Sequence, residues 1–168
     1  MEKLINMSFE MMNVPWIEQR KIQAQVLVPI VKAFQAELGE ERANQIVASV
    51  LDDRARNLGQ GFSALVGGSP IEKIVAGLPI MAAGDALDVE MIESTSDALD
   101  VNVTRCRYAE FYKELGEPDL GFLLVCRGDF AMAEGVSPDL EWTRTQTIMQ
   151  GASHCDFRYR LKGKESQR

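Results

Sequence analysis

Apolar residues recur every four positions near the start of the chain, a spacing that predicts a helix with one buried stripe between about residues 13 and 39. The stripe consists of Ile22, Val26, Ile30, Phe34 and Leu38. We expect Asn13 to cap this helix, Pro29 to kink or split it near Val26, and Gly39 to end it. Residues 1–12 are rich in Met and predict a loosely packed arm or a lid.

A second helical pattern begins at about Glu40 and ends at Gly59, so the two helices are expected to form an antiparallel hairpin. The side chains expected to face the common core are those of Ala43, Ile46, Val47, Val50, Leu51 and Leu58. The glycine-rich residues 59–70 lack the Gly-Lys-Ser/Thr ending of a phosphate-binding loop, and they predict a flexible connection. Ser69-Pro70-Ile71-Glu72 is typical of a capping box and predicts a short helix before Pro79.

From Leu87 onward the apolar residues alternate with polar ones, which predicts strands instead of helices. Residues 87–91 and 99–103 form a predicted hairpin around a turn at 94–97, and Tyr108 begins a short helix that Gly116 ends. The continuous apolar run Phe122–Cys126 predicts a central strand. The remaining predicted elements are a short helix, Phe130–Glu134, capped by Asp129 and ended by Gly135, and a final hairpin, Trp142–Leu161, that turns at Gly151–Ser153.

The predicted fold class is therefore α+β, with an N-terminal helical hairpin followed by an antiparallel sheet of about four or five strands and short covering helices. We expect a single domain over residues 1–168. Residues 1–84 would be mainly helical, residues 85–162 mainly β with short helices, and residues 163–168 a polar tail.

Composition and charge narrow the classes of function. The chain has 168 residues, of which 46% are hydrophobic and 26% charged, and a net charge of -7 that disfavours binding to nucleic acid or to an anionic membrane. Its three cysteines are widely spaced, with no CxxC pair, and they predict reduced thiols in a cytoplasmic protein. A homo-oligomer is plausible on base rates only.

The final predicted hairpin carries the densest group of reactive side chains. His154, the single histidine, precedes Cys155 and Asp156, and Arg144 lies across the turn. On a regular strand Cys155 would share a buried face with Phe157, whereas Asp156 would point the other way. Both could act on one substrate only if the strand began irregularly, for example at a bulge.

Two further readings remain open from the residues alone. Thiolates and imidazole suit zinc, so His154 with Cys155, Cys126 and Cys106 is a conceivable metal site, although the spacing matches no standard zinc pattern and we expect no metal. Asp129 and Glu134 are each explained as helix-end carboxylates, and either could also serve as a general base facing the sheet.

Three segments together resemble the L-2-amino-thiazoline-4-carboxylic acid hydrolase family. They are Val103–Gly116, Phe122–Gly135 and Thr143–Tyr159, and the most specific part is the Arg-Thr pattern at 144–145 followed by Gly151 and Cys-Asp-Phe-Arg at 155–158. The segments Ile17–Arg20 and Glu37–Ala43 also resemble that family, so the resemblance covers most of the chain. It implies a bacterial enzyme that opens a small cyclic isothiourea carboxylate, or a related cyclic amidine, to an N-carbamoyl product without a cofactor.

This reaction can be fitted to particular residues as a hypothesis. Cys155 would be the nucleophile if its pKa is lowered by His154 or an arginine; alternatively Asp156 or Asp129 would activate water while Cys155 only packs. Arg144 would hold the carboxylate of a small anionic heterocyclic substrate. The other side chains expected near the substrate are those of Thr145, Arg105, Tyr108 and Glu134. The rival class is a non-catalytic small-molecule-binding domain or a redox or metal sensor.

Overall fold

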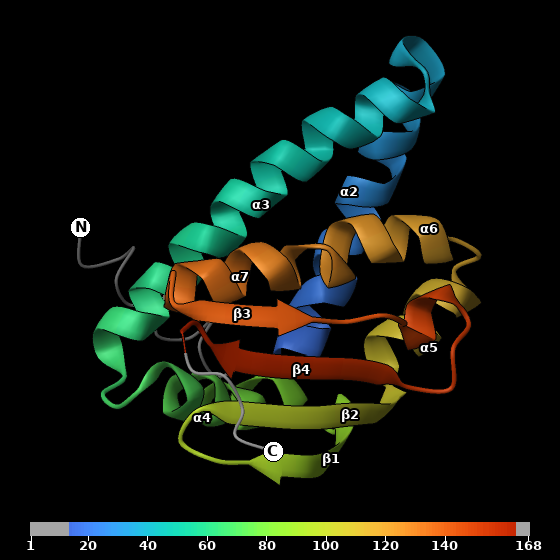
Figure 1. Cartoon of the computed structure of the whole chain (residues 1–168). Helices are drawn as coiled ribbons and strands as arrows, with labels where there is room; N and C mark the ends of the chain where they lie inside the picture. Colours follow the sequence, from blue (N-terminus) through green and yellow to red (C-terminus); the bar gives the residue numbers. More distant parts are fainter. Residues whose placement is uncertain (1–13, 164–168) are drawn as a thin grey trace.

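The computed structural model describes residues 14–163, so the predicted arm or lid, the Asn13 cap and most of the polar tail lie outside the described residues. Helices come first along the chain and pack on one face of a sheet (Figure 1). The leading helices are α2 (Trp16–Leu38), α3 (Glu40–Leu65) and α4 (Pro70–Ala82). The predicted capping box is present at the start of α4, where Ser69 and Glu72 bond each other's backbone N–H groups.

Four antiparallel strands form the sheet in the order β1-β2-β4-β3, which confirms the α+β prediction. The strands are β1 (Leu87–Ser94), β2 (Ala98–Cys106), β3 (Leu140–Thr143) and β4 (Cys155–Leu161). Between β2 and β3 the chain forms α5 (Arg107–Glu114), α6 (Pro118–Gly121), the π-helical turn η1 (Phe122–Cys126) and α7 (Gly128–Val136), and the short 3₁₀ turn η2 (Ile148–Gln150) precedes β4.

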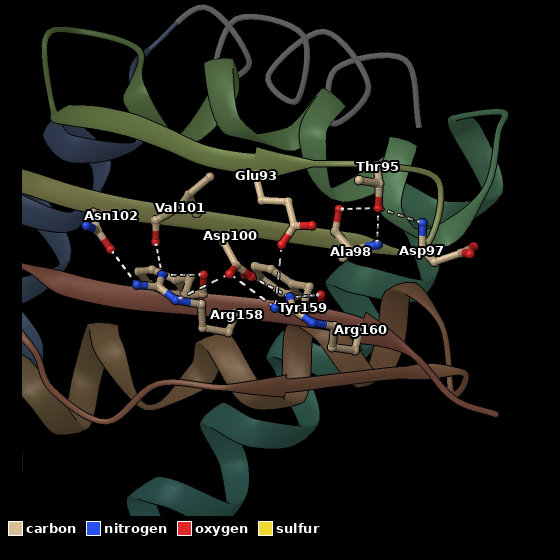
Figure 2. A network of polar contacts seen from close by, with 11 residues as sticks. Glu93, Thr95, Asp97, Ala98, Asp100, Val101, Asn102, Arg158, Tyr159 and Arg160 are labelled. Atoms are coloured by element: carbon tan, nitrogen blue, oxygen red, sulfur yellow. Dashed lines mark hydrogen bonds and ion pairs between the residues drawn. The ribbon is translucent and has the colours of Figure 1, made fainter. Parts of the chain in front are cut away.

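The two faces of the sheet differ in polarity. Val103 pairs with Cys155 and Val101 pairs with Phe157, and these buried side chains point toward the helices. The opposite face carries a polar network in which Arg160 pairs with Asp100 and Arg158 donates to Asn102 at 2.9 Å (Figure 2). The alternation expected for β4 is therefore confirmed, and only its apolar face belongs to the core.

The predicted stripe on α2 faces outward, which corrects the sequence-based expectation. Ile22, Val26, Ile30, Phe34 and Leu38 are between 43% and 64% exposed, whereas the neighbouring face of α2 is buried through Ala24, Val28 and Val31. These buried side chains belong to a core cluster with Tyr108, Ala109 and Tyr112 of α5 and Ala48 of α3, and α2 continues through Pro29 as one helix. Of the side chains predicted to face the core from α3, Ile46, Val50 and Leu58 are also exposed.

Gly59 does not end α3, and the expected flexible connection after it is mostly helical. A Cβ atom at Gly59 would lie 2.2 Å from the carbonyl oxygen of Met132 on α7, and one at Gly135 would lie 2.1 Å from the carbonyl oxygen of Arg56 on α3. These glycines therefore lie where two helix backbones touch. For the same reason Gly135 does not stop α7, which continues to Val136.

The apolar run Phe122–Cys126 is a helical turn and not the predicted central strand. It lies between α6 and α7 and contacts α3, so it is buried from several sides. A run without polar positions has no period by which a buried strand and a buried helix can be distinguished. Asp129 consequently lies inside the first turn of α7, instead of capping it.

The first strand of the final hairpin is also shorter than predicted. β3 ends at Thr143, and residues 144–154 form an irregular connection that includes η2 before β4 begins. Within residues 14–163, no single helix has the length and apolarity to cross a membrane; α3 and α4, bent by 107° at their break, meet that test only as a pair and by length and composition alone.

Candidate functional site

The sheet and the helices that cover it enclose a cavity of about 160 Å³. Its walls come from the inner face of β1, β2 and β4 and from α2, α3, α4, α5, η1 and α7. Helix α7 lies between α3 and the sheet edge at β3 (Figure 1). Apolar side chains make up most of the wall. The ionisable side chains that line it are those of Arg20, Arg54, Lys73, Cys106, Tyr108, Cys126, Asp129, Arg144, Cys155 and Tyr159.

Asp129 and Arg144 form an ion pair in the cavity wall. Arg144 Nη1 donates to Asp129 Oδ2 at 2.6 Å, and Arg144 Nη2 donates to the backbone oxygen of Cys126 at 3.1 Å. The Arg144 side chain is only 3% exposed, whereas Asp129 keeps 23% of its side-chain surface accessible. The pair therefore joins the connection after β3 to α7, with part of Asp129 facing the cavity space.

Aromatic rings surround the guanidinium of Arg144. Its Cζ atom lies between 5.4 and 5.9 Å from four ring centroids, which belong to Phe122, Phe130, Trp142 and Phe157. Arginine is suited to such a place because its guanidinium is planar, weakly hydrated and attracted to ring faces. Arg144 is thus fixed by its surroundings and already engaged by a carboxylate, which leaves it poorly placed to clamp a substrate carboxylate as the sequence predicted.

Burial raises the pKa of Asp129 to about 6, although the charge and hydrogen bond of Arg144 act in the opposite direction. A carboxyl group with such a pKa is mostly ionised at neutral pH, yet it is a stronger base than an ordinary aspartate. Arg20 also attracts the Asp129 carboxylate, without a direct ion pair. Asp129 can therefore accept and return a proton near neutral pH.

All three cysteines line the same cavity, and each is held as a thiol. Burial raises the pKa of Cys106 to about 11, and it also raises the pKa of Cys126 and of Cys155. The Sγ atom of Cys155 accepts a hydrogen bond from the backbone N–H of Ile148 at 3.2 Å, but this does not outweigh burial. The thiolate that a nucleophilic Cys155 needs is thus disfavoured.

Asp156 lies on the opposite face of the sheet from Cys155, because β4 begins regularly and without a bulge at that point. Its carboxylate accepts bonds from Thr145 N at 2.9 Å, Thr145 Oγ1 at 2.7 Å and Gln146 N at 2.9 Å. Partial burial acts to raise the pKa of Asp156, but these bonds outweigh it and leave the pKa below its ordinary value. Asp156 and Thr145 thus hold the connection after Arg144 and do not line the cavity.

The other residues predicted for the site lie either in the cavity wall or outside the cavity. Tyr108 lines the cavity, and its hydroxyl donates to the Met81 carbonyl at 3.2 Å. His154 contacts Gln146 and Ser153 outside the cavity. Arg105 pairs with Asp85 and Glu110 at the surface, and Glu134 pairs with Arg56. The structure therefore brings Cys155, Asp129, Arg144 and Tyr108 together and leaves the other predicted residues elsewhere.

Sequence reasoning missed the basic side chains that α2, α3 and α4 contribute to the cavity. Arg20, Arg54 and Lys73 are isolated in sequence among ordinary helix-surface residues, so no local pattern marks them. Within the described ranges no group of three or more His, Cys, Asp and Glu side chains is placed to hold a metal ion, so the zinc site considered from sequence gains no support.

Comparisons with known proteins agree with the fold and with the resemblance noted above. A family model described as L-2-amino-thiazoline-4-carboxylic acid hydrolase matches residues 19–159. No protein of curated function matches the chain. Among solved structures, the phenol-responsive sensory domain of the transcription activator PoxR, solved with phenol, is similar at a TM-score of 0.50 and 11% identity, covering 83% of this chain and 75% of that one. At that identity the likeness shows the fold alone.

Proposed function

The chain belongs to the L-2-amino-thiazoline-4-carboxylic acid hydrolase family, and on that premise we propose that it hydrolyses a small cyclic amidine inside the cavity, with Asp129 as the general base. The observation that carries this proposal is the position of Asp129. It is the one carboxylate among the described residues that line the cavity, and burial raises its pKa to about 6. General bases work best when their pKa lies near the operating pH.

The size of the cavity suits one small ring. An engineered apolar cavity of about 150 Å³ binds benzene, and the cavity here measures about 160 Å³. A five-membered ring with a few substituents is of a size to fit this space. The apolar wall formed by side chains such as Val101 and Phe157 would exclude bulk water from the ring.

The reaction would proceed by addition of water to the amidine carbon between the ring sulfur and nitrogen. Asp129 accepts a proton from the water as its oxygen bonds to that carbon. The tetrahedral adduct then collapses: its hydroxyl proton passes to the ring nitrogen as the carbon–oxygen double bond forms, the carbon–sulfur bond breaks, and the proton held by Asp129 passes to the leaving sulfur. The product is an N-carbamoyl amino acid that carries a free thiol, so the sum is substrate plus one water.

Arg144 and Cys155 have supporting roles in this proposal. Arg144 keeps the Asp129 carboxylate oriented and lowers its pKa from the value that burial alone would produce. Cys155 packs against the bound ring as a neutral thiol, because its pKa is raised by burial. Base catalysis by Asp129 therefore takes the place of the cysteine nucleophile considered from sequence.

Turnover of L-2-amino-thiazoline-4-carboxylate, followed as N-carbamoyl-cysteine by mass spectrometry, tests the proposal. We expect Asp129→Asn to lower kcat by about a hundredfold or more, as loss of a general base does. Glu134→Gln is the matched control, since Glu134 is a carboxylate on the same helix that pairs with Arg56 outside the cavity. Full activity in Asp129→Asn would refute the proposed role.

A small-molecule-binding domain is the second candidate function. It is favoured by the neutral state of the three cavity thiols and by the likeness of the fold to a sensory domain solved with phenol. A binding domain predicts that small rings raise the melting temperature while none is consumed. Product formation that depends on Asp129 separates the hydrolase from this alternative.

A further inference from the structure

The charge of the cavity wall is opposite in sign to the charge of the whole protein. Four basic side chains line the cavity, those of Arg20, Arg54, Lys73 and Arg144, against one carboxylate, Asp129. The chain as a whole carries a net charge of -7. Because Arg144 neutralises Asp129, the other three cations remain uncompensated at the cavity.

Arg20 and Arg54 are the least satisfied of these cations. Arg20 on α2 donates to Gln23 at 2.7 Å, and among residues 14–163 neither arginine forms an ion pair with a carboxylate. Lys73 differs, since its ammonium donates to both the backbone and side-chain oxygens of Ser63. The two arginines therefore offer guanidinium donors to the cavity that no described side chain takes up fully.

The two guanidinium groups also affect each other. Burial lowers the pKa of Arg20, and the positive charge of Arg54 lowers it further, while Asp129, Tyr108 and Tyr112 act in the opposite direction. Two like charges that face the same partly enclosed space repel one another unless an anion lies between them. Such an arrangement is costly in the empty protein and becomes favourable when an anion binds.

We propose that Arg20 and Arg54 form an anion subsite of the cavity, which binds the carboxylate of a small ring compound. A planar carboxylate matches the paired donors of arginine, and a pair of arginines can hold both of its oxygens. Arg54 is exposed whereas Arg20 is half-buried, so the carboxylate lies toward the rim while the ring enters the apolar interior. The assignment rests on the proposal that the substrate binds in this cavity.

This subsite replaces Arg144 as the anchor of the substrate carboxylate. Arg144 is engaged by Asp129 and enclosed by rings, whereas Arg20 and Arg54 lie on the two helices of the N-terminal hairpin and have donors to spare. The carboxylate and the reacting ring carbon would thus be held by different elements. Rings without a carboxylate would lack the anchor, so the protein would select ring compounds that carry one.

Equilibrium binding with two matched pairs of probes tests the subsite. Benzoate and benzamide have the same planar shape and differ in charge, and L-2-amino-thiazoline-4-carboxylate and 2-aminothiazoline differ by the carboxylate. We expect each carboxylate to bind the wild type at least about tenfold more tightly than its partner without a carboxylate. Arg20→Gln and Arg54→Gln should each weaken carboxylate binding by about tenfold or more, whereas binding of benzamide should change by less than about twofold.

Two further variants make the result specific. Arg56→Gln removes an arginine of α3 that pairs with Asp53 and Glu134 outside the cavity, and it should leave every probe unaffected. Arg54→Lys should restore part of the affinity, because it keeps the charge and loses the paired donors. Arg54 is exposed and forms no ion pair with a described residue, so Arg54→Gln gives an answer even if Arg20→Gln does not fold.

The outcome separates this inference from the proposed function. Equal affinity for the probes with and without a carboxylate, equal weakening of both by the arginine variants, or no binding of any carboxylate would overturn the subsite. Charge-dependent binding through Arg20 and Arg54 without hydrolysis would uphold the subsite while the hydrolase proposal fails. Hydrolysis that survives both arginine variants with unchanged KM would uphold the hydrolase and overturn the subsite.

Discussion

Arg144 reaches from the connection after β3 to Asp129 on α7, with Nη1 and Oδ2 2.6 Å apart, and the four surrounding rings leave its side chain 3% exposed. The ion pair is therefore a buried one, in which each charge depends on the other. This relationship positions the proposed base, and it also makes Arg144 important for stability.

Arg144→Met should accordingly destabilise the protein at pH 8 by about 3–5 kcal/mol, because it leaves the Asp129 carboxylate without its partner. Arg56→Met, which breaks an exposed pair with Glu134, should cost at most about 1 kcal/mol. Urea denaturation of the two variants against the wild type measures both values. Similar costs in the two variants would show that burial does not distinguish the pairs.

The raised pKa of Asp129 predicts a pH-dependent difference in stability. The folded protein holds the Asp129 proton up to about pH 6, whereas the unfolded chain releases it near pH 4. The resulting stabilisation is fully present below pH 4 and is lost as the pH rises through 6. Relative to Asp129→Asn, the wild type should lose roughly 2.4 kcal/mol of unfolding free energy between pH 4 and pH 7. Parallel pH profiles of the two proteins would contradict the raised pKa of Asp129.

Gly59 and Gly61 give a matched pair on α3. A Cβ at Gly59 would collide with the Met132 carbonyl, so Gly59→Ala should destabilise the protein by about 1–3 kcal/mol or more. No atom lies within 4 Å of a Cβ at Gly61, and Gly61→Ala should stabilise it by about 0.5–1 kcal/mol through helix propensity. Thermal denaturation would reveal the opposite signs, and a shared sign would argue against close packing of α3 on α7.

Val26 and Val31 provide a second pair, on α2. Val31 is 2% exposed and Val26 is 58% exposed. Val31→Ala should cost about 2 kcal/mol, whereas Val26→Ala should change stability by less than about 0.5 kcal/mol. If Val26→Ala proved the more costly substitution in chemical denaturation, the outward orientation of the Ile22–Leu38 stripe would be wrong.

Sequence patterns predicted the helices and strands more successfully than they predicted how these elements pack against one another. The capping box at Ser69 and the alternation along β4 depend on neighbouring residues, so local patterns were sufficient for both. The burial of α2 depends on distant contacts with α3 and α5, and the face with Ala24 and Val28 is buried in place of the stripe that the sequence predicted. Gly59 was predicted to end a helix, because the residues of α7 that pack against it are distant in sequence and no local pattern shows the contact.

The candidate site was likewise predicted where local patterns were sufficient and missed where distant residues meet. Cys155, Asp129, Arg144 and Tyr108 were all proposed from sequence and all line the cavity, yet Asp156 and His154 were proposed for their adjacency to Cys155 and lie outside it. Side chains of consecutive strand residues point to opposite faces of a sheet, so Asp156 points away from the cavity that its neighbour Cys155 lines. Arg20 and Arg54 meet at the cavity only after α2 and α3 pack, which no local pattern could show.

The dependence of kcat/KM on pH is the most direct test of Asp129 as the general base. We expect kcat/KM for L-2-amino-thiazoline-4-carboxylate to rise tenfold per pH unit below about pH 6 and to be level from about pH 7 to 9, because the pKa of Asp129 is raised to about 6. An activity that depends on the Cys155 thiolate would instead keep rising at and above pH 9, since burial raises the pKa of that thiol. A profile that rises only in that alkaline range, and not near pH 6, would rule out Asp129 as the general base.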